Sequence, residues 1–303
     1  MGPPEDQGYA ERVPPPLITR FAPSPTGLLH LGHAYSALLN FDLAKRAGGS
    51  FRLRIEDIDQ TRCQLGFEEA IGKDLLWLGI EPDGEVIRQS ERFDLYQNAV
   101  MSLADRGLVY RCFKTRAELQ ATLSAPQNGT PMRSAMQIAT GRLSANEEEH
   151  LISEGRAFAW RLDAMQAADA LRGRPLTWHE EIEGQPGHQH AIDLSLLTDE
   201  VIARKDVPTS YHLASVIDDA AQGVTLVWRG EDLNEAIPLH RVLQELLSLP
   251  APAYRHHKLI TDADGRRLAK RDKAKTLQSL KEGGATPSDI RQQLELPTTD
   301  EAT

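Results

Sequence analysis

Residues 20–33 read RFAPSPTGLLHLGH, and this stretch decides the fold. Two prolines and a glycine make a short, stiff loop, and His30 and His33 stand where that loop is expected to turn into a helix. A helix start presents unpaired N–H groups and the positive end of the helix dipole, so it is a natural anion site. Gly32 lets a flat ring approach the backbone closely. The stretch therefore predicts a helix start that stabilises a nucleotide's α-phosphate, with two imidazoles as added donors.

The segments around this loop predict a βαβ unit. A short strand is expected at 17–21, a helix at 34–47, and a strand at 51–55, where apolar and basic residues alternate. Because ligands lie beyond the carboxyl ends of parallel strands, the site should form there. The fold class expected is α/β, a doubly wound parallel sheet of the Rossmann type. The residues expected to converge in its crevice are Arg20, Ser24, His30, His33 and Glu56.

The rest of the chain is expected to resume this pattern after an interruption. Helices are predicted at about 66–78 and 92–106, and again at 211–221 and 237–247, with a strand at 224–230 between the last two. The expected divisions are a disordered tail at 1–16, the two halves of the nucleotide-binding domain at 17–107 and 206–257, an inserted α+β subdomain at 108–205, and a loop with a short helical C-terminus at 258–303.

The composition bounds the class of protein. The 303 residues are 40% hydrophobic and 26% charged, as in an ordinary globular protein. No apolar run approaches a membrane span, and the N-terminus has no apolar core, so neither a membrane protein nor a signal peptide is expected. A formal net charge of −10 argues against a strong non-specific nucleic-acid binder but leaves room for a local basic face. Two cysteines make no disulfide framework, so a cytoplasmic protein is expected. A monomer is expected as well.

A second motif lies in the dense basic run RRLAKRDKAK at 266–275. Standing alone, this run fits a solvated basic face, just as H-x-G-H alone fits an ordinary capping loop. Together, in this order and spacing, the two stretches resemble the ATP-binding signatures of class I aminoacyl-tRNA synthetases, in the glutamyl and glutaminyl branch. The resemblance implies that Lys270 stabilises the leaving phosphates. Arg267 and Ala269 depart from the family's usual Lys and Ser, which puts the rate of loop closure in doubt.

A third set of residues suits glutamate, which brings two carboxylates and one ammonium. The planar fork of arginine binds carboxylates, and Arg20 and Arg229 stand at expected strand ends. Glu56 and Tyr211 are candidates for the ammonium. The resemblance implies a glutamate site of Arg20, Phe21, Ala22, Pro23, Ser24, Glu56, Tyr211 and Arg229, and a nucleotide site of His30, Gly32, His33 and Lys270, of which His30, His33 and Lys270 would be catalytic.

Plainer roles stay open for the charged members of this set. Arg229 could make a surface ion pair with an acid of the following residues 231–232, and Glu56 could pair with Arg52 or Arg54. Asp218, Asp219 and the stretch RGED at 229–232 also match the family's pattern, and they are expected to hold the site and to contact the ribose or the tRNA end.

Cofactors follow from the resemblance, which implies ATP as a substrate with Mg²⁺ on its phosphates. The subfamily often carries zinc on a C-x-C segment in its insertion, but here Lys114 follows Cys112 where the second thiolate would stand. Because one thiol cannot hold tetrahedral zinc, no structural zinc and no protein metal ligand are expected.

The acceptor is the least determined part of the prediction. The chain ends soon after the basic run, so no anticodon-binding domain is expected. In this it resembles short paralogues of glutamyl-tRNA synthetase, which implies activation of L-glutamate by ATP and transfer to the queuosine base of tRNA(Asp). Two alternatives stay open. One is a short or split glutamyl-tRNA synthetase that charges a tRNA 3′ end, and the other is a non-catalytic paralogue that binds glutamate or RNA.

Overall fold

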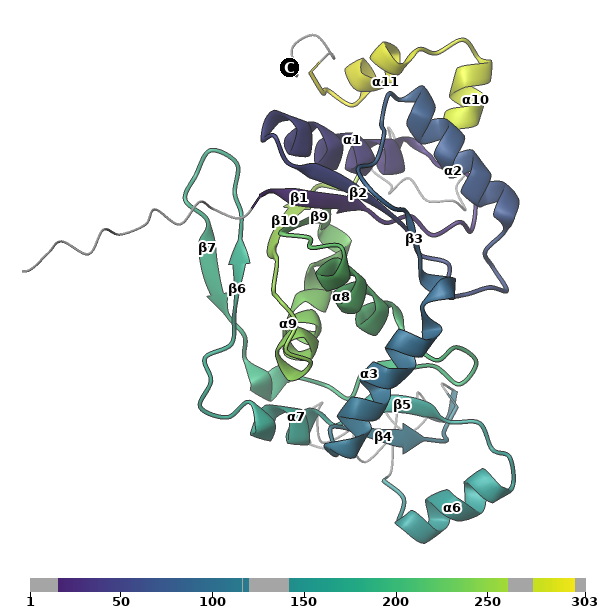
Figure 1. The fold of residues 1–303 in the computed structure, drawn as a ribbon, viewed down its shortest axis with the longest axis vertical. Helices are drawn as coiled ribbons and strands as arrows, with labels where there is room; N and C mark the ends of the chain where they lie inside the picture. The colour runs from purple at the N-terminus through teal and green to yellow at the C-terminus, as the bar shows by residue number, and fades with distance from the viewer. Residues whose placement is uncertain (1–15, 116, 120–141, 261–274, 298–303) are drawn as a thin grey trace, which may run out of the picture.

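Two sheets, one parallel and one mixed, lie side by side at the centre of the molecule (Figure 1). The computed structural model describes residues 16–115, 117–119, 142–260 and 275–297. The first sheet has the order β1-β2-β3, with strands β1 (Ile18–Phe21), β2 (Ser50–Ile55) and β3 (Ile87–Arg88). The second has the order β7-β6-β10-β9, with strands β6 (Thr177–Glu180), β7 (His188–Ala191), β9 (Leu226–Gly230) and β10 (Ala253–His257).

Strand β1 joins the two sheets because it runs beside β9. The Thr225 N–H donates to the Ile18 carbonyl at 3.0 Å, and the Ile18 N–H donates to the Thr225 hydroxyl at 2.8 Å. The starts of these strands therefore lie together, and their carboxyl ends, at Phe21 and Gly230, line one pocket. Parallel strands deliver their last residues to one edge of a sheet, so this edge is where a site can form.

Helices cover both faces of the sheets (Figure 1). Helices α1, α2, α10 and α11 share an apolar cluster with β1 and β2, while α3, α8 and α9 share another with strands of the middle region. Their bounds are α1 (Leu31–Arg46), α2 (Leu65–Trp77), α3 (Phe93–Asp105), α8 (Tyr211–Ala221), α9 (Ile237–Leu246), α10 (Leu277–Glu282) and α11 (Pro287–Gln293). This arrangement leaves the carboxyl edge of the sheets open between the two layers.

The middle of the chain forms a smaller layer and also extends the central sheet. Its antiparallel sheet β4-β5-β8 packs beneath α3 (Figure 1). The β6–β7 hairpin instead adds to β10, where Glu180 pairs in parallel with Tyr254. The remaining elements are β4 (Val109–Cys112), β5 (Ala159–Leu162), β8 (Val201–Ala203), α6 (Ala145–Ser153), α7 (Ala164–Ala170), and the short 3-10 helices η1 (Gln89–Glu91), η2 (Leu194–Leu196) and η3 (Glu231–Ala236).

The expected α/β class with a parallel sheet is confirmed. Helices α2 and α3 each begin within one residue of the predicted start, and α8 matches its predicted bounds. Helix α1 begins at Leu31 rather than at 34, because the His30 side chain already caps the helix there. The two-residue strand β3 was missed, since it is too short to show a period. The expected domain boundaries stay predictions, and residues 1–15 of the expected tail lie outside the described residues.

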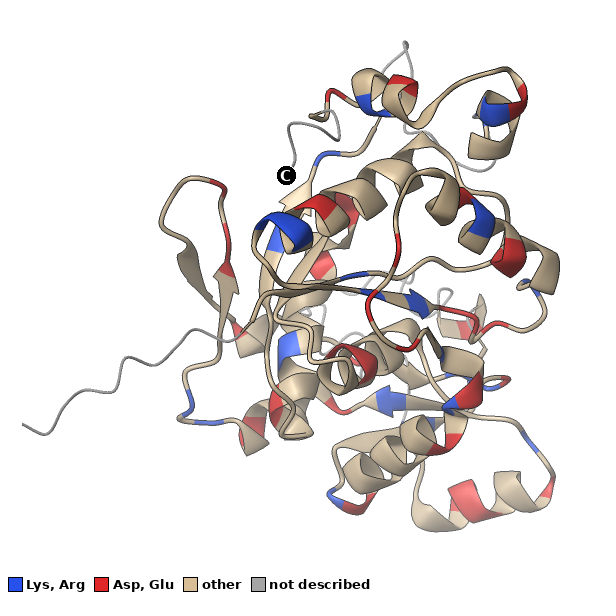
Figure 2. Cartoon of the chain, turned by 45° about the horizontal axis from the view of Figure 1, so that its top comes forward, with Lys and Arg blue, Asp and Glu red and all other residues tan. Residues whose placement is uncertain are grey.

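Charges are mixed over the described chain. Figure 2 shows acidic and basic residues interspersed along its helices and strands. Within the ranges that the structure describes, no helix is both long enough and apolar enough to cross a bilayer.

Candidate active site

The start of α1 is capped by two imidazoles. The Gly32 N–H donates to His30 Nδ1 at 3.1 Å, and the His30 N–H donates to His33 Nδ1 at 3.2 Å. The two rings lie 3.9 Å apart between centroids. Because both Nδ1 atoms accept a backbone hydrogen bond, each neutral ring carries its proton on Nε2. The capping thus fixes one tautomer, in which each Nε2 is a hydrogen-bond donor.

Gly32 is needed for this capping. A Cβ at Gly32 would lie 3.1 Å from Cε1 and 3.2 Å from Nδ1 of His30. The flat ring that approaches the Gly32 backbone in this structure is therefore the imidazole of His30. The chain after the basic run returns to the start of α1. The backbones of Thr276 and His30 form an isolated antiparallel β-bridge, and the Leu277 N–H donates to the Leu29 carbonyl at 2.9 Å. Lys270 itself lies outside the described residues.

A buried ion network underlies the opposite side of the site. Arg54 has no exposed surface, and its Nη1 donates to Asp219 Oδ1 at 2.6 Å while its Nη2 donates to Glu56 Oε1 at 3.1 Å. Arg20 Nε donates to the same Asp219 oxygen at 3.2 Å. The Glu56 N–H donates to the Pro23 carbonyl at 3.0 Å, which holds the loop after β1 against the end of β2. The network joins β1, β2 and α8 at one point.

The network sets the charge states of its acids. Burial alone would raise the pKa of Asp219, but the Arg54 and Arg20 guanidinium groups outweigh it and lower that pKa to about 2. Burial raises the pKa of Glu56 above its ordinary value, although Arg54 opposes the shift. Asp219 is therefore ionised at all ordinary pH values and anchors two arginines, whereas the Glu56 carboxylate takes up a proton more readily than an ordinary glutamate.

Among the buried arginines of the described chain, Arg229 alone has no ion pair. It is 4% exposed, its Nη1 donates to the Tyr211 hydroxyl at 3.2 Å, and its Nη2 donates to the Leu233 carbonyl at 3.0 Å. Its Nε has no hydrogen-bond partner, and no carboxylate of the described chain lies within ion-pairing distance of it. The alternative of a surface ion pair is therefore wrong. For Glu56 the alternative pairing with Arg54 is present, and Glu56 lines the pocket as well.

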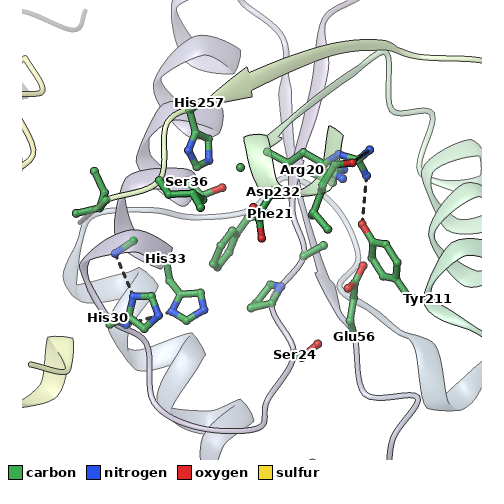
Figure 3. A pocket seen from close by; sticks show the side chains of 18 residues that line it. Arg20, Phe21, Ser24, His30, His33, Ser36, Glu56, Tyr211, Asp232 and His257 are labelled. Carbon is green, nitrogen blue, oxygen red and sulfur yellow. Dashed lines mark hydrogen bonds between the residues drawn. The ribbon is translucent and has the colours of Figure 1, made fainter. Parts of the chain in front are cut away.

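These groups face a single cavity of about 520 Å³. In Figure 3, His30 and His33 lie on one side of it, and Glu56 and Tyr211 lie on the other. The predicted site residues that line it are Arg20, Phe21, Ala22, Pro23, Ser24, His30, Gly32, His33, Glu56, Tyr211 and Arg229. The structure thus brings together every predicted site residue that it describes, while the roles assigned to them stay predictions.

Other lining residues were missed by the sequence interpretation. They are Ser36, Leu233, His257, Leu259 and Ile260, whereas Gly230 and Asp232, which also line the cavity, belong to the stretch 229–232 that the sequence had already indicated. Two signals could have found some of them. Ser36 lies three residues after His33, on the same face of α1, and His257 ends a parallel strand. Within the described ranges, no three His, Cys, Asp or Glu side chains gather to hold a metal ion.

Asp218 does a different job from its neighbour Asp219. It has no exposed surface, and it accepts hydrogen bonds from Gln89 Nε2 at 2.9 Å, Arg92 Nε at 2.8 Å and the Tyr96 hydroxyl at 2.7 Å. All three donors belong to the segment that runs into α3. Asp218 therefore fixes α8 to α3. Neither Asp218 nor Asp219 is among the residues that line the cavity, so their expected contact with the ribose or the tRNA end stays a prediction.

Comparison with known proteins gives a consistent result. The family model "tRNA synthetases class I (E and Q), catalytic domain" matches residues 16–298. The Glutamyl-Q tRNA(Asp) synthetase of Rhodobacter capsulatus is 45% identical over 284 residues, which cover 91% of this chain and 98% of that protein. Glutamate–tRNA ligase 2 of Methylorubrum populi is 41% identical, but the chain spans only 58% of its length.

The solved structures agree with the sequence matches. A glutamate tRNA ligase from Elizabethkingia meningosepticum, in complex with its amino acid, superposes with a TM-score of 0.75 at 28% identity. The match covers 94% of this chain and 64% of that one. The resemblance seen in the sequence motifs is thus confirmed over almost the whole chain.

Proposed function

This chain belongs to the class I tRNA synthetases of the glutamate and glutamine type, and we propose that it is a ligase for L-glutamate. It would form glutamyl-adenylate from glutamate and ATP, and then transfer the glutamyl group to the queuosine base of tRNA(Asp). The observation that carries the proposal is Arg229, a buried guanidinium with no carboxylate partner in the described chain, on the wall of the pocket. A buried unpaired charge is unfavourable, so this group calls for an anionic ligand.

Glutamate complements the rest of the pocket. Arg229 and Arg20 supply two guanidinium forks for two carboxylates, and Arg20 is already oriented through its Nε by Asp219. Glu56 and the Tyr211 hydroxyl lie on the same wall and suit the ammonium group. A glutamine substrate would place a neutral amide against Arg229, which would leave the buried charge unpaired. The pocket should therefore prefer glutamate to glutamine.

The activation step uses the other wall. A carboxylate oxygen of glutamate attacks the α-phosphorus of ATP, the bond from that phosphorus to the bridging oxygen breaks, and pyrophosphate leaves with the electron pair. We assign His30 and His33 to the growing charge on the α-phosphate, because their capping keeps Nε2 protonated and donating. Lys270 would stabilise the departing phosphates. Mg²⁺ would be held by the phosphates of ATP, since no described side chains form a cage for it.

The transfer step is an acyl exchange. A hydroxyl oxygen of the acceptor attacks the glutamyl carbonyl carbon, the bond between that carbon and the phosphate oxygen breaks, and AMP leaves with the electron pair. The hydroxyl proton passes to a phosphate oxygen or to water. The acceptor is proposed by likeness to the R. capsulatus protein, of which the chain spans 98%, whereas it spans 58% of the glutamate–tRNA ligase.

A second candidate function is charging of a tRNA 3′ end. It is favoured by the several glutamate–tRNA ligases that share 37–41% identity with this chain. The chemistry of activation would be identical in the two cases, so the amino-acid pocket does not separate them. The acceptor alone does.

The test uses the purified full chain in two assays. Exchange of labelled pyrophosphate into ATP should depend on glutamate and not on glutamine. Labelled glutamate should then transfer to tRNA(Asp) that carries queuosine and not to the same tRNA with guanosine at that position. Labelling of queuosine-free tRNA(Glu) would favour the second candidate, and a folded protein without glutamate-dependent exchange would contradict both.

A further inference from the structure

A second hollow, of about 570 Å³, adjoins the amino-acid pocket. The two share Asp232 and Leu233 as wall residues, and His212 of the second hollow follows Tyr211 of the first. Its walls come from the β6–β7 hairpin, from the segment around η2, and from η3 and the start of α9. A group held there would thus reach an intermediate in the amino-acid pocket from the side of Tyr211.

The hollow combines an apolar floor with a rim of acids. Buried Leu197 and Leu239 form part of the floor, and Trp178 stands at one side. The carboxylates on its wall are Asp193, Glu200, Asp232 and Glu235. None of its described lining residues is Lys or Arg. This local excess of acids differs from the mixed charges seen over the rest of the described chain (Figure 2).

The charge of this hollow is negative at neutral pH. The hydrogen bonds from Ser195 lower the pKa of Asp193, so that acid stays ionised. Burial lowers the pKa of His212, which keeps the one imidazole on the wall neutral, although Glu200 opposes the shift. Such a wall attracts a cation and hydroxyl donors, and it repels phosphate.

We propose that this hollow is the acceptor subsite, and that it takes a flipped-out base whose side chain carries a protonated amine beside a diol. The inference rests on the proposed function, because queuosine has these groups. When a diol hydroxyl reaches the glutamyl carbonyl in the first pocket, the amine a few bonds away falls in the neighbouring hollow. The acids bind the ammonium, and the apolar floor and Trp178 contact the base.

The same wall selects against the other acceptor. A tRNA 3′-terminal adenosine carries no cation at neutral pH, and its own phosphate would approach the four carboxylates. An extruded base, by contrast, can enter while the phosphates of its strand stay outside. The subsite therefore acts as a specificity device for the transfer step and takes no part in activation.

The experiment neutralises the rim without changing its shape. Glu200→Gln and Glu235→Gln, alone and combined, are compared with Glu149→Gln, an exposed acid on α6. Wild-type protein should bind queuosine-bearing tRNA(Asp) about tenfold more tightly than the same tRNA with guanosine, and the combined variant should bind the two alike. Its transfer rate per bound tRNA should fall about tenfold more than its pyrophosphate exchange, while Glu149→Gln retains both.

The outcomes separate the two levels of the proposal. If wild-type protein activates glutamate and labels queuosine but the combined variant keeps its preference for queuosine, the subsite assignment is overturned and the function stands. If wild-type protein fails to activate glutamate, or labels a 3′ end, the function itself is contradicted. Pyrophosphate exchange by the variant reports that its fold and amino-acid pocket are intact.

Discussion

The ion network beside the amino-acid pocket and the face of α2 near α10 each bury a carboxylate, one with charged partners and one without a hydrogen bond to its Oδ2 in the described chain. Asp219 is 4% exposed and contacts two guanidinium groups, which lower its pKa to about 2. Asp74, on α2, is 6% exposed, and its Oδ2 has no hydrogen-bond partner in the described chain. Burial there raises the pKa to about 6, against a weaker opposing effect of Lys281. Two carboxylates with little exposed surface thus differ: Asp219 stays an anion above pH about 2, whereas Asp74 takes up a proton near pH 6.

The difference shows what a buried charge near a cavity means. Asp74 borders a hollow of about 850 Å³, but its neighbours there are apolar side chains, amides and charged side chains of both signs. Within the described residues Arg229 has no carboxylate partner, but Arg20, Glu56 and Tyr211 around it supply the complement of one amino acid. An unpaired buried charge therefore indicates a ligand when its surroundings match that ligand, and otherwise it indicates a local loss of stability.

The largest effect is expected from removing the unpaired guanidinium. Arg229→Ala should lower kcat/KM for glutamate activation by about 10³- to 10⁴-fold, which corresponds to about 4–5 kcal/mol, because a buried charge pair with the substrate is lost. Arg229→Lys keeps the charge without the fork and should lose about 10²-fold. Pyrophosphate exchange at varied glutamate and varied ATP measures both. Unchanged glutamate kinetics in a folded Arg229→Ala protein would remove the basis of the substrate assignment.

A smaller effect, on stability, is expected from breaking the paired network. Asp219→Asn leaves the fully buried Arg54 with Glu56 as its one acid in the described chain, so unfolding should need about 3–4 kcal/mol less. The pKa of Asp219 is lowered in the folded state, so its contribution is present above the ordinary Asp value of about 4 and is lost as pH falls towards 2. Urea unfolding measures the change.

An exposed pair provides the control for that network. Glu69 and Lys73 lie on one face of α2, 3.6 Å apart, and both are largely exposed. Glu69→Gln should change the free energy of unfolding by less than about 0.5 kcal/mol, because solvent screens such pairs. An equal loss in the two variants would mean that burial of the network contributes nothing.

The sequence predicted those parts of the site whose residues are neighbours along the chain. His30, Gly32 and His33 lie within one turn, so the sequence could place them at a helix start, but that the two imidazoles cap this helix was seen only in the structure. The set of glutamate residues came from the family resemblance, and the structure gathers its described members in one pocket because they end parallel strands or begin α8. Periodicity gave α2, α3, α8 and α9, which are long and regular.

The buried network was beyond the reach of the sequence. Arg54 and Asp219 are 165 positions apart, and each alone fits an ordinary surface charge. Only the packing of α8 against β2 shows that they share one buried contact. The burial of Asp74 could not be predicted either, since a single acid on a helix does not show that α10 will lie next to it. The β6–β7 hairpin was placed in the insertion, and its pairing with β10 depends on tertiary packing.

Loss of the Glu56 carboxylate is expected to raise the KM for glutamate by about tenfold. Because burial raises the pKa of Glu56, its carboxylate takes up a proton at a higher pH than an ordinary glutamate, and attraction for the substrate ammonium is then lost. The KM for glutamate should therefore rise, by up to about tenfold, as falling pH protonates Glu56, while the KM for ATP stays constant. Glu56→Gln should raise the KM at all pH values and abolish this acid limb. An acid limb that persists in the variant would assign the titration to another group.

Apart from the exposed control pair, the smallest effect concerns Asp74, and it acts in the opposite direction to the change at Asp219. Its pKa is raised in the folded state from 3.8 to about 6, so the folded protein holds a proton that the unfolded chain releases, and stability falls as pH rises through that window. The whole shift would be worth about 3 kcal/mol, but the adjoining hollow admits water, so about 1 kcal/mol is expected. Asp74→Asn should therefore stabilise the protein at pH 7, and the gain should fade as pH falls from about 6 to about 4. Urea unfolding of the wild-type protein and the variant at pH 7 and at pH about 4 measures the difference in the free energy of unfolding. A loss of stability at pH 7 would show that Asp74 has a favourable partner and that the two buried carboxylates are alike.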